Sequence, residues 1–180
     1  MGHRASKEVE CDLSLERLEE IRMLTQLPIP DIIKMRVQFL KWSPSDDMTQ
    51  DQFFAIPAVA VNPLRHRLFS LFELSASQTI AFQDFASLMA IFTYHGSRDS
   101  KLRLSFKLQD MDGDGRITKP DLIAYMKLVV DFGDKLDVLA SRTLEEASTD
   151  ASGDFLSYDD FAKVVTTTDD YETKLLLELS

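Results

Sequence analysis

Apolar side chains recur at helical spacing on both sides of one short acidic segment, residues 110–121. Ahead of it, one predicted helical face carries Leu102, Ser105, Phe106 and Gln109, of which Gln109 is more polar than that face prefers. Behind it, apolar and aromatic residues return at intervals of three and four, at Leu122, Tyr125, Met126, Val129 and Val130. This spacing is typical of amphipathic helices. The pattern therefore predicts a helix, a tight acidic loop and a second helix.

The acidic segment has the sequence Asp-Met-Asp-Gly-Asp-Gly-Arg-Ile-Thr-Lys-Pro-Asp and fits the EF-hand calcium template. Calcium is a hard cation that prefers several oxygen ligands, and a tight loop turns its alternate residues inward. Gly115 stands where the chain must turn with positive φ, which residues with a Cβ resist. The predicted ligands are the carboxylates of Asp110, Asp112, Asp114 and Asp121 and the backbone carbonyl of Arg116.

The last position of this loop departs from the template. Calcium sites usually place a bidentate glutamate there, whereas this chain has Asp121. Aspartate is one methylene shorter, so it should bind through one oxygen or through water. The lower coordination number favours Mg²⁺, which accepts six ligands and keeps waters. We expect a calcium site of reduced affinity, with Mg²⁺ as the candidate occupant at rest.

Three further segments repeat this layout with weaker ligands. Each has an apolar anchor followed by a polar residue and a phenylalanine: Met48 with Gln52-Phe53, Ile80 with Asp84-Phe85, and Leu156 with Asp160-Phe161. Together with Ile117, the anchors are spaced 32, 37 and 39 residues apart, as four tandem units would be. The sequence therefore predicts an all-α fold with two EF-hand lobes, in which short loop strands pair unit one with two and unit three with four.

The ligand positions in the other loops are poor. Loop one (41–52) has Lys41 where the first carboxylate belongs, and loop two (73–84) lacks the turn glycine, so neither is expected to hold a metal. Loop four fits two registers, one beginning at Thr149 and one, with an extra residue, beginning at Ser148. Either register offers too few carboxylates for tight binding.

These units predict the organisation of the chain. An N-terminal segment and helix (1–27) precede the first EF-hand pair (28–95), and a linker (96–101) leads to the second pair (102–166). A C-terminal tail (167–180) follows.

Composition narrows the function classes. A net charge of −10 argues against nucleic-acid binding, which needs a clustered basic surface. A single cysteine, Cys11, allows no internal disulfide, and no secretory signal or membrane-spanning segment is visible. The three histidines are scattered, and no phosphate-binding glycine loop or nucleophile elbow occurs. We expect a cytoplasmic protein that is not an enzyme.

The chain opens with Met-Gly-His-Arg-Ala-Ser, which matches the N-myristoylation pattern at Gly2. A single acyl chain supports only marginal, reversible attachment to a membrane. Peripheral membrane association is therefore the most that this segment predicts.

Several stretches resemble the calcineurin B family, which includes the phosphatase regulatory subunit and the homologous proteins that bind sodium/proton exchangers. They are the Met-Gly start with Ser6, residues 56–64 with Asn62-Pro63-Leu64, residues 106–112, and residues 142–147. The resemblance implies a myristoylated, calcium-responsive subunit that grips an amphipathic helix in a hydrophobic groove. Its calcium ligands carry over to the third loop and not to loops one and two. The partner is a phosphatase catalytic subunit or an exchanger tail, and a free calcium sensor remains a further alternative.

Overall fold

The structure, a computed structural model, describes residues 12–93, 95–129 and 133–167. In this part of the chain, four helix–strand–helix units follow one N-terminal helix, α1 (Leu15–Thr25). The first two units comprise α2 (Ile29–Trp42), β1 (Asp47–Met48) and α3 (Gln50–Ala55), then α5 (Arg65–Phe69), β2 (Ile80–Ala81) and α6 (Phe82–Ile91), with α4 (Pro57–Ala60) between them. The last two comprise α7 (Arg98–Gln109), β3 (Ile117–Thr118) and α8 (Lys119–Val129), then a 3-10 turn (Gly133–Lys135), α9 (Leu136–Ala147), β4 (Phe155–Leu156) and α10 (Tyr158–Thr166). The all-α prediction is confirmed.

The helices that leave loops one and four begin with reciprocal side-chain caps. Thr49 Oγ1 accepts from the Gln52 amide at 3.3 Å, and Gln52 Oε1 accepts from the Thr49 amide at 2.8 Å. Ser157 and Asp160 repeat this arrangement at the start of α10, at 3.2 and 3.1 Å. Such capping boxes satisfy amide groups that have no partner inside the helix. Local sequence therefore sets where both helices begin.

The four apolar anchors pair across two short antiparallel sheets. Met48 lies opposite Ile80 in the first sheet, and Ile117 lies opposite Leu156 in the second. All four side chains are buried. The predicted pairing of unit one with two and unit three with four is therefore confirmed at all four anchor residues.

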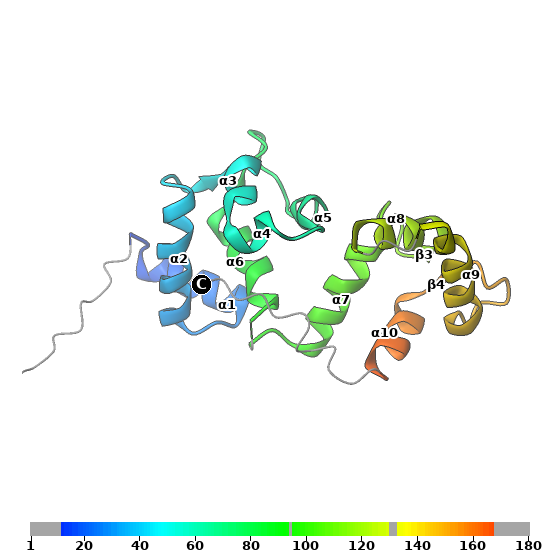
Figure 1. Cartoon of the computed structure of the whole chain (residues 1–180). Coiled ribbons are helices and arrows are strands. Elements are labelled where there is room, and N and C mark those ends of the chain that lie inside the picture. Colours follow the sequence, from blue (N-terminus) through cyan, green and yellow to red (C-terminus); the bar gives the residue numbers. More distant parts are fainter. Residues whose placement is uncertain (1–11, 94, 130–132, 168–180) are drawn as a thin grey trace, which may run out of the picture.

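Two hydrophobic clusters fill the two halves of the protein, and α7 lies between the halves (Figure 1). Leu104 and Leu108 belong to the N-terminal cluster, whereas Leu102 and Phe106 belong to the C-terminal one. Because α7 presents apolar residues to both sides, the halves share a helix. It begins at Arg98, within the segment expected to be the linker.

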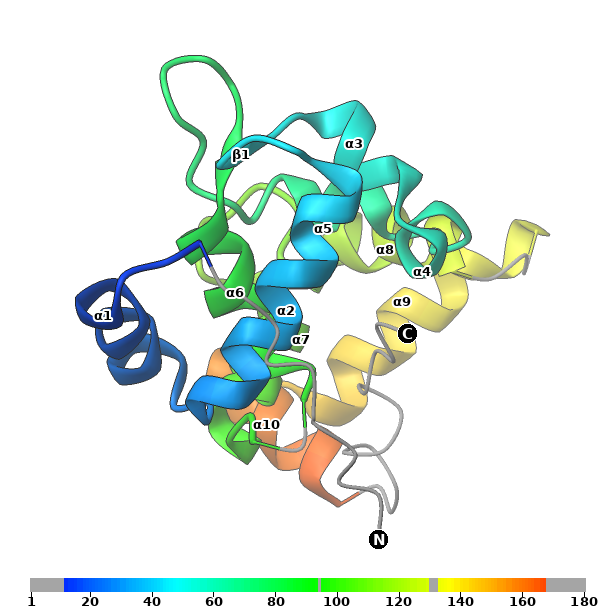
Figure 2. The ribbon, with the colours of Figure 1, turned by 90° about the vertical axis from the view of Figure 1, so that its left-hand side faces the viewer.

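Helix α1 packs beside α2 and α6 (Figure 2), with Leu18 and Ile21 buried in the N-terminal cluster. The guanidinium of Arg36, only 2% exposed, ties the segment ahead of α1 to loop one. It pairs with Asp12 at 2.5 Å and with Asp46, and it lies 5.0 Å from the ring centre of Phe82. The hydrogen bonds from Arg36 hold the pKa of the Asp12 carboxyl below its usual value.

Candidate metal centre

The third loop starts where α7 ends and finishes where β3 joins α8. Its tight course depends on two glycines with positive φ, Gly113 at +78° and Gly115 at +85°. The predicted turn at Gly115 is confirmed. Glycine adopts this conformation without the steric cost that other residues meet. The backbone can therefore fold the alternate residues of the loop toward one point.

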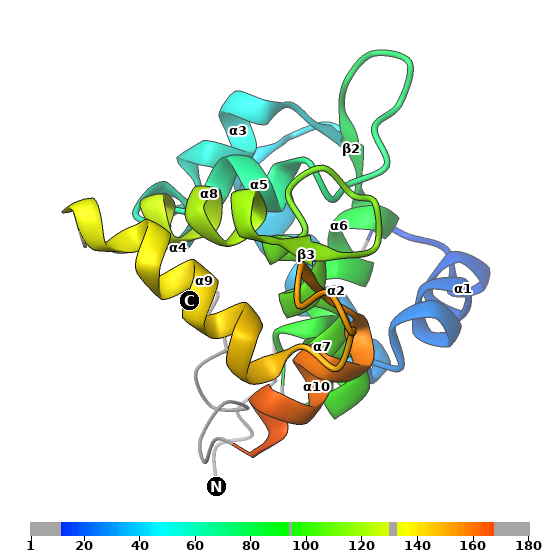
Figure 3. The same ribbon diagram turned by 90° about the vertical axis from the view of Figure 1, so that its right-hand side faces the viewer.

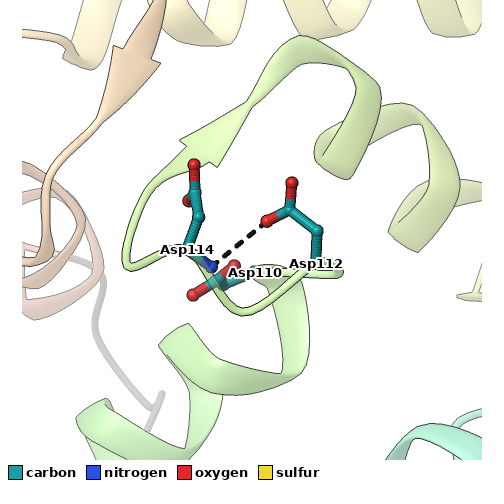
Figure 4. Close-up of side chains that lie close together, drawn as sticks. All are labelled: Asp110, Asp112 and Asp114. Carbon is teal, nitrogen blue, oxygen red and sulfur yellow. Dashed lines mark hydrogen bonds between the residues drawn. The ribbon is translucent and has the colours of Figure 1, made fainter.

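Three carboxylates converge in this loop (Figure 4). Asp110, Asp112 and Asp114 each contribute one carboxylate oxygen, and these three oxygens lie within 4.8 Å of one another. Asp110 is buried, whereas the other two are exposed. Among the described residues, no other group of three or more acidic, histidine or cysteine side chains lies close enough together to hold an ion. The structure thus brings together three of the predicted ligands.

Backbone amides hold the three carboxylates in place. The amides of Gly113 and Gly115 donate to the two oxygens of Asp110, at 2.8 and 3.0 Å. The amide of Asp114 donates to Asp112 Oδ1 at 3.2 Å, the bond drawn in Figure 4, and the amide of Arg116 donates to Asp114 Oδ1 at 2.8 Å. These bonds orient the carboxylates but leave their negative charges facing one another. An all-oxygen, multiply charged donor set is the chemistry that Ca²⁺ and Mg²⁺ prefer, so the residues fit such an ion.

Asp121 is also buried, and it closes the loop rather than joining the group of three. Its Oδ1 accepts from the Met111 amide at 3.1 Å, and its Oδ2 accepts from the Thr118 amide at 2.9 Å and from the Thr118 hydroxyl. One carboxylate therefore joins the two ends of the loop. Its role as the last ligand stays a prediction, which requires the side chain to exchange at least one of these bonds for the ion.

Arg116, whose carbonyl is the fifth predicted ligand, has a second feature that the sequence did not indicate. Its guanidinium lies 4.4 Å from the ring centre of Phe155 in loop four. Cation–π contacts of this kind contribute about 0.5–1 kcal/mol at exposed sites. The aromatic residue directly before the Leu156 anchor was the available signal for this link between the two loops. Binding through the Arg116 carbonyl stays a prediction.

The first half of loop four follows the register that begins at Ser148. Ser148 Oγ accepts from the Asp150 amide, Asp150 Oδ2 from the Ser152 amide, and Ser152 Oγ from the Asp154 amide, at 3.1, 2.9 and 3.2 Å. In loop three, Asp112 and Asp114 likewise accept from the amide two residues further along the chain. The turn glycine is Gly153, with φ of +68°. Hydroxyls and one carboxylate here occupy the places of three carboxylates.

The second half of loop four follows the other register. Leu156 pairs with Ile117, and Asp160 holds the last position. Two residues therefore separate Gly153 from Leu156, where loop three has one between its glycine and its anchor. The sequence left two registers open because each describes one half of the loop.

Loop two keeps the turn without a glycine. Gln78 takes the glycine position with φ of +59°, a conformation that costs a residue with a Cβ about 1–2 kcal/mol. Loop two also keeps an acidic residue at each end, Glu73 and Asp84. Burial, followed by the charge of Glu73, raises the pKa of the Asp84 carboxyl.

An apolar groove opens between α2 and α6 in the N-terminal half. Its volume is about 340 Å³, and it is lined by Asp31, Lys34, Met35, Gln38, Trp42, Phe85, Met89 and Thr93. The floor is apolar and aromatic, while the rim carries one residue of each charge. Such a lining suits the apolar face of an amphipathic segment.

Comparison with known proteins identifies the family. No family model matches the chain. The calcineurin B subunit of Naegleria gruberi is 31% identical over 169 residues, which cover 91% of this chain and 94% of that protein. The chain belongs to the calcineurin B family. The calcineurin B subunits of Schizosaccharomyces pombe and Candida glabrata are 31% and 33% identical, and the matches cover 80% and 82% of those proteins.

Membership of the calcineurin B family confirms the resemblance that the sequence motifs indicated. It also supports the prediction that the protein is not an enzyme, because the calcineurin B relatives are non-catalytic regulatory proteins. Among the described helices, none combines the length and the apolar character needed to cross a membrane. The predicted myristoylation site, Gly2, lies outside the described residues.

Proposed function

We propose that this protein is a calcium-binding regulatory subunit that holds an amphipathic helix of a protein phosphatase catalytic subunit. The observation that carries the proposal is the convergence of Asp110, Asp112 and Asp114 in the third loop of a calcineurin B family member. The three relatives named above are calcineurin subunits, which supports a phosphatase partner over an exchanger tail.

The metal part of the proposal concerns one site with a shortened last ligand. Titration calorimetry of the metal-free protein with Ca²⁺ is expected to show one site. Millimolar Mg²⁺ is expected to weaken the apparent calcium affinity, because Mg²⁺ competes for a site that offers few protein oxygens. A submicromolar dissociation constant for Ca²⁺ that millimolar Mg²⁺ leaves unchanged would reject the prediction of reduced affinity. No heat and no spectral change with either ion would reject the metal site itself.

The partner part of the proposal places the apolar face of the helix in the groove between α2 and α6. Met35 lines this groove and is only partly buried, so Met35→Lys introduces a charge there without emptying the core. Val138→Lys on α9, where the side chain is 57% exposed, is the matched control. Co-purification with the catalytic subunit of a protein phosphatase is expected to fail for the Met35 variant and persist for the control. Equal co-purification of both variants would contradict this placement.

The remaining alternative is a free sensor, which exposes its groove only when calcium binds. Binding of a hydrophobic dye separates the two. A stably bound subunit is expected to show little change with calcium, whereas a large rise would favour the sensor.

The proposal includes a myristoyl group on Gly2. Intact-protein mass spectrometry is expected to show the added acyl mass on the wild type and its loss in Gly2→Ala.

A further inference from the structure

Helix α5 of the N-terminal half lies beside the end of α7, where the metal loop begins (Figure 1), and α8 overlaps α5 in the view of Figure 3. Arg67 of α5 reaches across this boundary. Its Nη2 donates to the carbonyl oxygens of Lys107, at 2.6 Å, and Asp110, while its Nε donates to the carbonyl of Leu108 at 3.4 Å. One guanidinium therefore contacts three backbone oxygens of another half of the protein.

These three carbonyls lie in the last turn of α7 and at the residue that follows it. The last four carbonyls of a helix have no partner inside the helix, and the helix dipole makes that end negative. An arginine fork is suited to both features, since it donates several hydrogen bonds and carries a positive charge. One of the oxygens belongs to Asp110, whose carboxylate is the first predicted ligand.

Packing at the same boundary joins the metal loop to the N-terminal half. Leu104 and Leu108 of α7 belong to the N-terminal cluster, and Tyr125 of α8 packs against it. A cavity of about 540 Å³ lies beside these contacts, between Arg67 and Ser70 on one side and the metal loop on the other. The end of α7 is thus held by α5 through a polar clamp and by the core through apolar contacts.

We infer that Arg67 is a positioning residue for the metal loop, so that the N-terminal half contributes to the metal affinity of the C-terminal half. The inference rests on the proposed function of the third loop. Arg67 fixes the backbone at Asp110 before the ion arrives, which lowers the ordering that binding must impose. By linkage, metal binding strengthens the contact between the halves by the same factor.

Two matched variants test this role. Arg67→Lys keeps the positive charge near the loop but loses the fork that spans the carbonyls. Arg65→Lys, on the same helix and also half-buried, is the control, because Arg65 donates to the Ala60 carbonyl within its own half. In calorimetric calcium titrations, the Arg67 variant is expected to bind about fivefold more weakly. The control is expected to stay within about twofold of the wild type.

A second measurement separates positioning from a purely structural role. Trp42, the one tryptophan of the chain, lines the groove of the N-terminal half, so its emission follows unfolding of that half. Calcium is expected to raise the melting temperature seen by Trp42 in the wild type, and the Arg67 variant should lose about half of that rise. Equal affinity for calcium, or an equal calcium-induced rise, in Arg67→Lys and the wild type would overturn the inference. A wild type that binds no calcium would instead reject the proposed function.

Discussion

Loops three and four face each other across one pair of strands, yet different interactions close them. In loop three, three carboxylates converge and leave a concentration of negative charge. In loop four, Ser148 and Ser152 flank a single carboxylate, Asp150, and the hydroxyl of Thr149 donates to Asp160 at 2.7 Å. Both loops place an apolar anchor in the same sheet. The EF-hand scaffold can therefore be held by hydroxyl hydrogen bonds or arranged for a metal, and the choice lies in a few side chains.

The largest expected difference between the two loops is in metal affinity. Asp112→Ala removes one of the three converging carboxylates, and calcium binding is expected to weaken about 100-fold, or ~2.7 kcal/mol. Asp150→Ala changes the corresponding residue of loop four and is expected to leave calcium affinity within about twofold. Calorimetry of both variants checks the comparison. Equal losses in the two variants would mean that loop four shares in the binding.

The next effect concerns stability. Asp160 is buried and accepts hydrogen bonds from Thr149 and Ser157. Asp160→Ala leaves these donors without their partner and is expected to lower the free energy of unfolding by about 2 kcal/mol. The neighbouring Asp159 is exposed, so Asp159→Ala is the control and should change stability by less than about 0.5 kcal/mol. Urea unfolding followed by circular dichroism measures both.

A change at Asp121, the last predicted ligand, is expected to strengthen calcium binding by loop three. Asp121→Glu supplies the missing methylene, which allows both oxygens to reach the ion, and calcium affinity is expected to rise about tenfold. The competing effect of Mg²⁺ should fall. Asp160→Glu is the matched change in loop four and should leave calcium binding unaltered. Weaker calcium binding in Asp121→Glu would show that closing the loop through Met111 and Thr118 matters more than direct ligation.

Acid should act on loop four through the same buried carboxylate. The hydroxyl of Thr149, followed by that of Ser157, holds the pKa of Asp160 below its usual value. A lowered folded-state pKa gives stability that is present above the unfolded-state pKa, about 3.9, and is lost as the pH falls through the folded value. Wild-type unfolding free energy should therefore fall below about pH 4, by less than the Asp160→Ala loss. If the unfolding free energy of Asp160→Ala falls as steeply with decreasing pH as that of the wild type, other carboxylates cause the fall.

The smallest expected effect tests the turn of loop two against that of loop three. Gln78 adopts the positive φ that glycine adopts in loop three. Gln78→Gly relieves this strain but gives the unfolded chain more freedom, so stability is expected to rise by about 0.5 kcal/mol. Ala76→Gly, two residues earlier, adds the freedom without relieving strain and should lower stability. A loss of stability in Gln78→Gly would contradict the inference that the positive φ of Gln78 strains the backbone.

Much of the fold could be predicted from the sequence because it depends on local patterns. The anchors Met48, Ile80, Ile117 and Leu156 are separated by regular intervals, and each lies where a strand must pair. Three of the candidate ligands were also predictable, since the spacing of Asp110, Asp112 and Asp114 is confined to five residues. Local spacing of this kind fixes geometry before any tertiary contact forms.

Other features were not predictable because they join distant segments. Arg67 and the α7 carbonyls are about forty residues apart in sequence, and Arg36 of α2 lies 24 residues from its partner Asp12, ahead of α1. An arginine on a helix is expected to be solvent-exposed, since nothing in the neighbouring residues indicates its partners. Loop four was ambiguous because an insertion shifts only part of its pattern.

By itself, the sequence determined the helical units, the loop that gathers carboxylates and the family resemblance, since each follows from spacing within a few residues. Tertiary structure decided how the two halves share α7, which backbone carbonyls Arg67 contacts and which amides donate to the Asp121 carboxylate. The physical reason is that unpaired carbonyls, buried charges and apolar faces take whichever partner the packed chain brings within reach.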